Sequence, residues 1–385
     1  MASVDISRLD QLDWDFPRAG TVRGSVQSIH WFPGNFIAQI PATLIQILSR
    51  PGDLIFDPFA GSATTAVEAA KLGRAAIVSD RLSVSELIGK AKLVLINGAL
   101  DPKSLDEVKA ALTFEQQCRS LEAGRNGEGS DQILTRWYSA DTLSQLRYLW
   151  RLVESLPLET RRVLTAVFSD VLFQCASTGG SVTRTGKKRR HHWGWVADNV
   201  VPKSPLDHNA IALFLLRLNT LPVEDWLTDE RSPNLSIVQQ DARCLAIKDD
   251  VIDLVVTSPP YIGMIDYAHA NRLLYAWMGW SLKAERKDEI GARFRRGRQH
   301  VVADYLADMR AAREEIRRVL RSGSYCALIL GQSKRFPGTV DKVLEDFGDV
   351  MNLAWGPRAR NPSRRRVSER AAGEPVEFVA VFRKP

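Results

Sequence analysis

The chain has 385 residues, of which 45% are hydrophobic and 25% charged, and it carries a formal net charge of +7. This length suits one large catalytic domain with insertions or two domains, and the composition is that of an ordinary globular protein. No apolar run reaches the roughly 18–20 residues that cross a bilayer, which argues against a membrane protein. The excess of basic residues suits a polyanionic partner but does not prove one.

Residues 1–20 are acidic and polar, without the basic and apolar regions of a signal peptide, so we expect a cytoplasmic protein. The four cysteines are widely spaced and form no CxxC pair. This spacing indicates reduced thiols and no structural zinc, and we expect no other metal site.

Residues 1–98 read as the first half of a parallel α/β core. We expect a short buried strand at Leu54–Phe56, a glycine-containing loop, and a helix that is closed by Gly73. A second buried strand ends at Asp80. Strand, helix and strand in this order form a βαβ unit, which implies parallel strands.

Residues 99–234 form a long insertion with a largely helical pattern. A polar, basic loop interrupts the helices and contains Lys187, Arg189 and Arg190. We expect this insertion to recognise the target or, alternatively, to mediate dimerisation or partner binding. A charge run of this kind can also be an ordinary solvated loop.

Residues 235–385 complete the core. The sequence predicts two strands before residue 257, an amphipathic helix over residues 303–323, and strands at 323–331 and 376–382. The predicted fold is therefore α/β, with a doubly wound, mostly parallel sheet and a large helical insertion. Arginine-rich segments near residues 286–300 and 357–370 are expected to be exposed, mobile loops.

The first chemical motif is Thr257-Ser258-Pro259-Pro260-Tyr261, which follows an apolar strand at the sheet edge where α/β proteins bind ligands. The two prolines stop the strand and leave carbonyls that can accept hydrogen bonds from a ligand amino group. Ser258 adds a hydroxyl, and Tyr261 offers a flat face for a planar base. Acceptors around an exocyclic amine localise a lone pair that is otherwise delocalised into the ring. An ordinary turn after a buried strand is the alternative.

The second motif runs from Asp57 to Thr65 and joins a strand to a helix. Gly61 permits a tight turn and close approach of a ligand to the backbone. Thr64 or Thr65 can cap the helix, and Asp57 can hold a polar or cationic group. The motif is neither a GxGxxG dinucleotide fingerprint nor a P-loop, and alone it can be a structural turn.

Together the two motifs resemble those of the DNA amino-methyltransferases, which modify cytosine N4 or adenine N6. The resemblance covers both halves of the core and implies a Rossmann-like class I methyltransferase fold with S-adenosylmethionine as cofactor. It implies that the turn after Asp57 binds the methionine part of the cofactor, although Ala63 stands where the family usually has glycine. By the same resemblance, Asp80 meets the ribose hydroxyls and Asp241 the adenine amino group.

Residues 30–36 with Pro41 resemble the family's N-terminal cofactor segment, although a loop that packs Trp31 and Phe32 into the core is the alternative. The cofactor-binding residues that the resemblance implies are Phe32, Gly34, Asn35, Asp57, Phe59, Ala60, Gly61, Ser62, Thr64, Asp80, Asp241 and Thr257.

The expected reaction is direct methyl transfer to the amino group of a base flipped out of double-stranded DNA. Ser258, Pro259, Pro260 and Tyr261 are the predicted catalytic residues. In the family that the chain resembles, serine rather than aspartate at the start of this motif more often accompanies cytosine N4 specificity, so the resemblance favours cytosine N4, and adenine N6 is the alternative. Cytosine C5 chemistry is excluded because it needs a cysteine nucleophile, usually after a proline, and no cysteine here follows one.

Candidates for binding the base or the DNA are Asp266, Tyr267, Asn271, Arg272, Lys187, Arg189 and Arg190, with the Arg293–Arg298 and Arg358–Arg366 loops as a second set. Rival interpretations are an RNA or protein methyltransferase, a non-catalytic DNA-binding or cofactor-binding protein on the same fold, and a nucleotide-binding α/β protein with other chemistry. We expect association with the nucleoid. A restriction endonuclease or defence-system protein is a candidate partner, and the sequence does not indicate the oligomeric state.

Overall fold

The structure is a computed structural model that describes residues 4–16, 25–35, 37–119, 133–176, 205–222, 234–361 and 377–385. The predicted basic loop with Lys187, Arg189 and Arg190 lies outside the described residues, as do residues 362–376. None of the helices in the described ranges has the length and apolar character needed to cross a bilayer.

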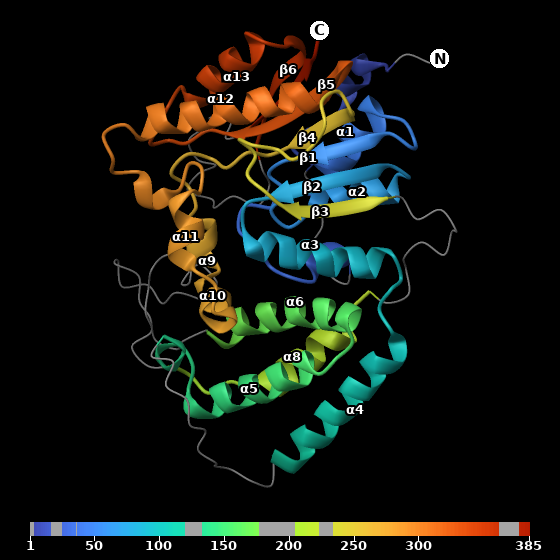
Figure 1. Cartoon of the computed structure of the whole chain (residues 1–385), viewed down its shortest axis with the longest axis vertical. Helices are drawn as coiled ribbons and strands as arrows, with labels where there is room; N and C mark the ends of the chain where they lie inside the picture. Colours follow the sequence, from blue (N-terminus) through green and yellow to red (C-terminus); the bar gives the residue numbers. More distant parts are fainter. Residues whose placement is uncertain are drawn as a thin grey trace.

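The described strands form one seven-stranded sheet in the order β3-β2-β1-β4-β5-β7-β6 (Figure 1). Every neighbouring pair from β3 to β5 is parallel, whereas β7 runs antiparallel between β5 and β6. This order confirms the predicted doubly wound, mostly parallel sheet. The strands are β1 (Leu54–Asp57), β2 (Ala75–Asp80), β3 (Leu235–Gln239), β4 (Ile252–Thr257), β5 (Leu320–Gly331), β6 (Asn352–Arg360) and β7 (Glu377–Arg383).

Alternate strand residues feed two cores, one on each face of the sheet. In β1, Ile55 packs with α1 (Gln39–Leu48) and α2 (Thr64–Lys71). Its neighbour Phe56 packs with α12 (Val301–Val319) and α13 (Thr339–Gly348) on the opposite face. Both side chains are fully buried, which explains why the strand is an apolar run without polar alternation.

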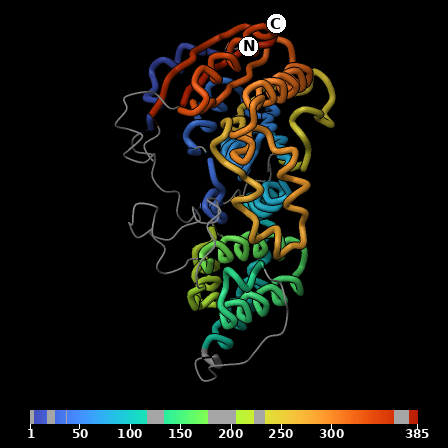
Figure 2. The backbone as a smooth tube through the Cα atoms, turned by 90° about the vertical axis from the view of Figure 1, so that its left-hand side faces the viewer, coloured from blue at the N-terminus to red at the C-terminus, as the bar shows by residue number. Residues whose placement is uncertain are grey.

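The insertion contributes α4 (Pro102–Arg119), α5 (Ala140–Glu154), α6 (Leu158–Cys175) and α8 (Ala210–Asn219). These helices share a third core with α3 (Ser83–Ile96), which flanks the β2–β3 edge of the sheet (Figure 1). In the side view the insertion helices lie below the sheet and lengthen the molecule along one axis (Figure 2). The short helices α9 (Tyr267–Ala270), α10 (Arg272–Met278) and α11 (Leu282–Lys287) connect the post-SPPY segment to this helical layer.

Two predicted boundaries were wrong. The amphipathic helix ends at Val319 rather than at residue 323, because Leu320 already pairs with Ile252 as the start of β5. The segment expected to be a loop from residue 357 begins inside β6, which pairs with β7 up to Arg360. Most side chains of β6 face solvent at the sheet edge, so its sequence lacks the apolar pattern of a strand.

Candidate active site

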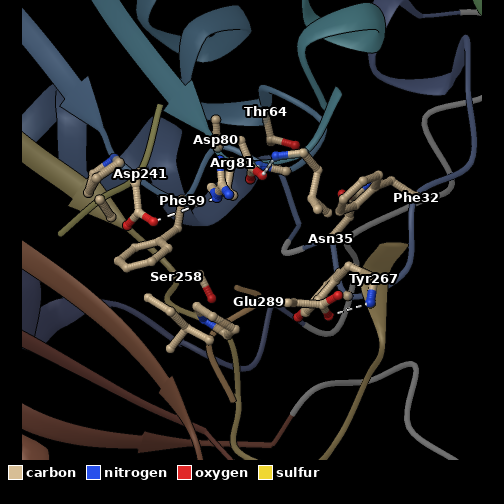
Figure 3. A pocket seen from close by; sticks show the side chains of 18 of the residues that line it. Phe32, Asn35, Phe59, Thr64, Asp80, Arg81, Asp241, Ser258, Tyr267 and Glu289 are labelled. Carbon is tan, nitrogen blue, oxygen red and sulfur yellow. Dashed lines mark hydrogen bonds and ion pairs between the residues drawn. The ribbon is translucent and has the colours of Figure 1, made fainter. Parts of the chain in front are cut away.

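A pocket lies at the carboxyl ends of β1, β2 and β4, where the loops after these strands meet (Figure 3). The space between its lining atoms amounts to about 770 Å³, a figure that includes the solvent at its open mouth. Predicted residues that line it are Phe32, Gly34, Asn35, Phe59, Ala60, Gly61, Thr64, Asp80, Asp241, Ser258, Pro260 and Tyr267. Both motifs and the N-terminal segment therefore contribute to one cavity.

Asp57 lies beneath this pocket and does not line it. Its carboxylate is fully buried and accepts hydrogen bonds from Thr65 Oγ1 and Thr257 Oγ1, each at 2.6 Å, and from the Phe59 N–H at 3.1 Å. Burial raises the pKa of Asp57 to about 6, and the hydrogen bonds from Thr257 and Thr65 oppose this rise. Asp57 and Thr257 thus hold the two motif loops together.

The turn after β1 is shaped by two residues with left-handed backbone, Gly61 (φ +51°) and Ala63 (φ +60°). The Gly61 N–H donates to Asp80 Oδ2 at 2.8 Å, and a Cβ on Gly61 would lie 3.1 Å from the ring of Phe32. The side chain of Ala63 is buried, so the residue where the family usually has glycine contributes a methyl group to the core. Ser62 is buried as well, and its hydroxyl lies 3.5 Å from Lys92 Nζ.

The two predicted aspartates that line the pocket, Asp80 and Asp241, differ in their partners and in the direction in which their pKa values are shifted. Burial raises the pKa of Asp80, whose oxygens accept from the Gly61 and Leu82 N–H groups. Burial alone would raise the pKa of Asp241, but hydrogen bonds from Arg243 outweigh it and leave that pKa below its ordinary value. Asp241 is thus held ionised by Arg243 at 2.7 Å and by Arg81 at 3.6 Å.

The SPPY loop is held from below by β5 and α12. Ser258 Oγ donates to the Ile329 carbonyl at 3.2 Å and lies 3.4 Å from the Tyr261 hydroxyl. The Pro260 carbonyl accepts from the buried Tyr305 hydroxyl at 3.1 Å. The Tyr261 ring packs against Gly331 so closely that a Cβ there would lie 2.0 Å from it. Pro259 and Tyr261 do not line the pocket themselves.

The segment after the motif closes the opposite wall. The ring of Tyr267 stacks on Phe32 with centroids 5.9 Å apart and planes 20° apart. Asn271 is fully buried and donates to the Tyr267 carbonyl at 2.9 Å, while Asp266 is buried and pairs with Arg286 at 3.1 Å. Arg272 lies 4.9 Å over the ring of Trp137. Of the predicted base-binding residues in the described ranges, Tyr267 lines the cavity, whereas Asp266, Asn271 and Arg272 do not.

Glu289 is a pocket residue that sequence reasoning missed (Figure 3). Its carboxylate is 6% exposed and accepts hydrogen bonds from the N–H groups of Tyr267, at 2.6 Å, and Ala268, at 3.2 Å. Burial raises the pKa of Glu289 to about 8, and Asp266 and Asp80 add to this effect. The other pocket residues that were missed are Pro58, Arg81, Leu82, Ala242, Asp288 and Ile290.

The charged lining gives the pocket an acidic character. Asp80, Asp241, Asp288 and Glu289 face it, and Arg81 is the basic residue among its lining side chains. Because burial raises the pKa of Glu289 to about 8, that carboxyl is neutral near pH 7 and the negative charge of the lining comes from the three aspartates. Arg81 is itself paired with Asp288 at 2.6 Å. This set favours a ligand with positive charge and with hydroxyl or amino groups to donate, as the sulfonium, ammonium and ribose groups of S-adenosylmethionine provide.

The insertion anchors the N-terminal wall of the pocket. Buried His30 lies 2.7 Å from Ser169 Oγ of α6, and the Trp31 N–H donates to Asp170 at 3.1 Å. Arg217 of α8 pairs with Asp170 at 3.0 Å and donates to the carbonyls of Ser28 and Ile29 at 2.7 and 3.0 Å. The insertion helices therefore hold the segment that presents Phe32, Gly34 and Asn35.

The family model N6_N4_Mtase, described as DNA methylase, matches residues 9–83, which include the N-terminal segment, the turn after β1 and Asp80. The type II methyltransferase M.BsoBI of Geobacillus stearothermophilus is 25% identical over 281 residues, or 66% of this chain and 53% of that protein. The chain thus spans about half the length of this relative. The two matches confirm the resemblance to the DNA amino-methyltransferases, whose methyl donor is S-adenosylmethionine.

Three solved structures are similar at low identity. They are TrmN of Thermus thermophilus (13% identity, TM-score 0.34, 94% of this chain and 52% of that one), a SAM-dependent methyltransferase of Methanosarcina mazei (11%, 0.29, 89% and 96%) and the rRNA methyltransferase aviRa of Streptomyces viridochromogenes (12%, 0.31, 94% and 94%).

Proposed function

We propose that this protein transfers a methyl group from S-adenosylmethionine to the exocyclic amine of a base flipped out of double-stranded DNA, with cytosine N4 as the favoured target. The observation that carries the proposal is that the turn after β1 and the SPPY serine line the same pocket. A cofactor on the first and an amino group on the second would lie within one cavity. The description of the matched family model, DNA methylase, supports DNA as the substrate.

In this proposal the chain's own residues position the two reactants. Asp80 accepts from ribose hydroxyls, and Phe32, Gly34 and Asn35 cover the methionine part. When bound, S-adenosylmethionine supplies a methyl group on a sulfonium that is open to direct attack. The acidic lining favours this cationic cofactor over its neutral thioether product.

Ser258 and the Pro259 carbonyl are the proposed acceptors for the target amine. Both residues follow the end of β4, whose pairing with β5 stops at Thr257. The Pro260 carbonyl is already bonded to Tyr305, so Pro260 shapes the loop instead. Tyr261 of this loop and Tyr267 after it supply aromatic rings, and we propose that one of them stacks on the flipped base. Positioning and electrostatics then supply most of the acceleration, without a covalent intermediate.

The choice of cytosine N4 over adenine N6 as the target rests on Ser258. Its hydroxyl is a weaker acceptor than the carboxylate of a DPPY-like motif, and serine at this position more often accompanies cytosine in the family that the chain resembles. A cognate restriction endonuclease is a proposed partner, supported by the type II designation of M.BsoBI. Action on chromosomal DNA would place the protein with the nucleoid.

The test is expression in a host without DNA methylation, followed by base-resolved detection of N4-methylcytosine and N6-methyladenine. We expect N4-methylcytosine at one recurrent sequence, and we expect Ser258→Ala to remove it. N6-methyladenine alone would correct the base and keep the reaction class. DNA with no new methyl groups, while the purified protein methylates RNA, would overturn the proposal.

A further inference from the structure

A basic surface flanks the loop that follows the SPPY motif. It consists of residues 293–298 (RFRRGR) and residues 334–336 (KRF), which we call the basic rim. Gly263 of the loop lies between the two segments. A Cβ on Gly263 would lie 2.7 Å from the ring of Phe336 and 3.5 Å from Arg296 Cβ. The rim therefore adjoins the loop that starts at the proposed catalytic residues.

Phe294 organises the first segment. It is 37% exposed, and the guanidinium groups of Arg286, Arg295 and Arg298 lie 4.4, 5.5 and 5.7 Å from its ring centroid. In the second segment Arg335 lies 5.9 Å over Phe336. An aromatic face holds a guanidinium group by a cation–π interaction and leaves its N–H edges free to donate. Arg295, Arg298 and Arg335 are thus held on aromatic rings, and Arg295 also donates to the Lys287 carbonyl.

The backbone of the rim is tied to the post-SPPY loop. The Arg293 N–H donates to the Ile265 carbonyl at 3.1 Å, and the Phe294 N–H donates to Asp266 at 2.8 Å. On the other side of the loop, the Gly263 N–H donates to the Gly291 carbonyl at 2.7 Å. The first segment of the rim is therefore fixed relative to the loop that begins at the SPPY motif.

The positive charge on five side chains of the rim is not paired with any carboxylate among the described residues. These side chains are Arg295, Arg296, Arg298, Lys334 and Arg335. Arginines of α12 are paired instead, as Arg310 is with Asp346 and Arg318 with Glu315. An unpaired cluster of guanidinium groups beside a pocket fits a polyanion that lies across the pocket mouth.

We propose that the basic rim binds the phosphates of duplex DNA on either side of the flipped nucleotide and sets the position of the duplex over the pocket. This inference rests on the proposed function, since it takes DNA as the substrate. Contacts to phosphates fix register without reading sequence, so the rim positions the DNA and leaves base recognition to other parts of the chain. Phe294 acts through the arginines that it orders.

The experiment measures the affinity of the full-length protein for a 30-base-pair DNA duplex by fluorescence anisotropy over a range of salt concentrations. The variant carries Arg295→Ala, Arg296→Ala and Arg298→Ala together. We expect at least tenfold weaker binding and a slope of log Kd against log salt that is smaller by about 2–3, since each phosphate contact contributes about 0.9. The triple substitution to lysine keeps the charges and should restore most of the slope.

Two further variants sharpen the test. Phe294→Ala leaves the charges in place but removes the ring that orders them, so we expect weaker binding with a salt slope near that of the unmodified protein. Arg383→Ala is the matched control, because Arg383 is also exposed and lies 5.9 Å over an aromatic ring, Tyr325, near the opposite end of β5. It should change neither affinity nor slope. Binding of S-adenosylhomocysteine, followed by calorimetry, reports whether each variant is folded.

An alanine variant that binds S-adenosylhomocysteine and duplex DNA with unchanged affinity and slope would overturn the inference. Rim-dependent binding of RNA without binding of duplex DNA would overturn it too. The proposed function is tested separately by methylation in cells. Rim-dependent binding of DNA without any methylation would support the rim and refute the reaction, whereas methylation without rim-dependent binding would do the reverse.

Discussion

Thr257 donates a hydrogen bond of 2.6 Å to Asp57 and joins two motifs that lie 200 residues apart in the sequence. Asp57 ends β1 and Thr257 ends β4, and these strands are parallel neighbours in the sheet. Because Asp57 also accepts from Thr65 at the start of α2, its carboxylate links a strand, a helix and the SPPY loop. The proposed cofactor and base sites thus share one buried anchor.

Thr257→Val tests this anchor, because valine keeps the shape and removes the donor. The Asp57 carboxylate would remain buried with one hydrogen bond fewer, and its pKa would rise further above the present value of about 6. We expect the free energy of unfolding at pH 7 to fall by about 1–3 kcal/mol. Urea denaturation measures this change. Thr257→Ser keeps the hydroxyl, so its free energy of unfolding should fall by less. If the free energy of unfolding fell equally in the two variants, the methyl group of Thr257 would matter instead of its hydroxyl.

Gly331→Ala tests whether the position of Tyr261 controls the reaction. The added Cβ would lie 2.0 Å from the Tyr261 ring, so the ring has to move. We expect methylation to fall at least tenfold, a barrier increase of about 1.4 kcal/mol or more, with little change in cofactor affinity. Turnover on DNA and calorimetry with S-adenosylhomocysteine separate the two effects. At Gly348, which ends α13, an added Cβ meets open space, so Gly348→Ala is the matched control. Full activity in Gly331→Ala would count against a role for the ring position.

The core strands could be predicted because each is a short apolar run beside a glycine or proline turn. Ile55 and Phe56, for example, are both buried, on opposite faces of the sheet. β6 could not be predicted, because an edge strand with one solvated face and several exposed side chains lacks that pattern. Strand β6 pairs with β7, and the sequence between these two strands has no pattern typical of a strand.

The candidate site divides in the same way. Residues within the two motifs could be placed because the motifs end neighbouring parallel strands, whose carboxyl ends meet at one edge. Glu289 could not be predicted, because it lies in a charged segment of the sequence. Its carboxyl group is held at the pocket by hydrogen bonds from the N–H groups of Tyr267 and Ala268, which only the folded chain shows. Nor could the sequence show that the insertion supports the pocket wall, since Asp170 and Arg217 meet residues 28–31 only in the folded chain.

Arg217→Ala tests whether the insertion supports cofactor binding. Without the guanidinium group of Arg217, Asp170 loses this ion pair and the carbonyls of Ser28 and Ile29 lose a donor. The segment that leads to Phe32 then loosens, so we expect about tenfold weaker binding of S-adenosylhomocysteine by calorimetry. Arg151 is an exposed arginine on α5 of the same insertion, and Arg151→Ala should bind normally. Unchanged affinity in Arg217→Ala would mean that the pocket wall holds its position without the insertion.

Glu289→Gln should change how stability depends on pH. In the folded protein burial raises the pKa of Glu289 to about 8 from an ordinary value of 4.5. Between these values the unfolded chain releases a proton that the folded protein keeps, so this carboxyl lowers stability as pH rises and the effect levels off above 8. Glutamine does not titrate. The free energy of unfolding of the variant, relative to the unmodified protein, should therefore rise across this window by a few kcal/mol at most, since one pKa unit corresponds to about 1.4 kcal/mol.

Urea denaturation at several pH values measures the difference, and the contributions of Asp57 and His30 cancel because both proteins contain them. A difference that stays constant with pH would mean that Glu289 is ionised in the folded protein at neutral pH, held as a carboxylate by the N–H groups of Tyr267 and Ala268.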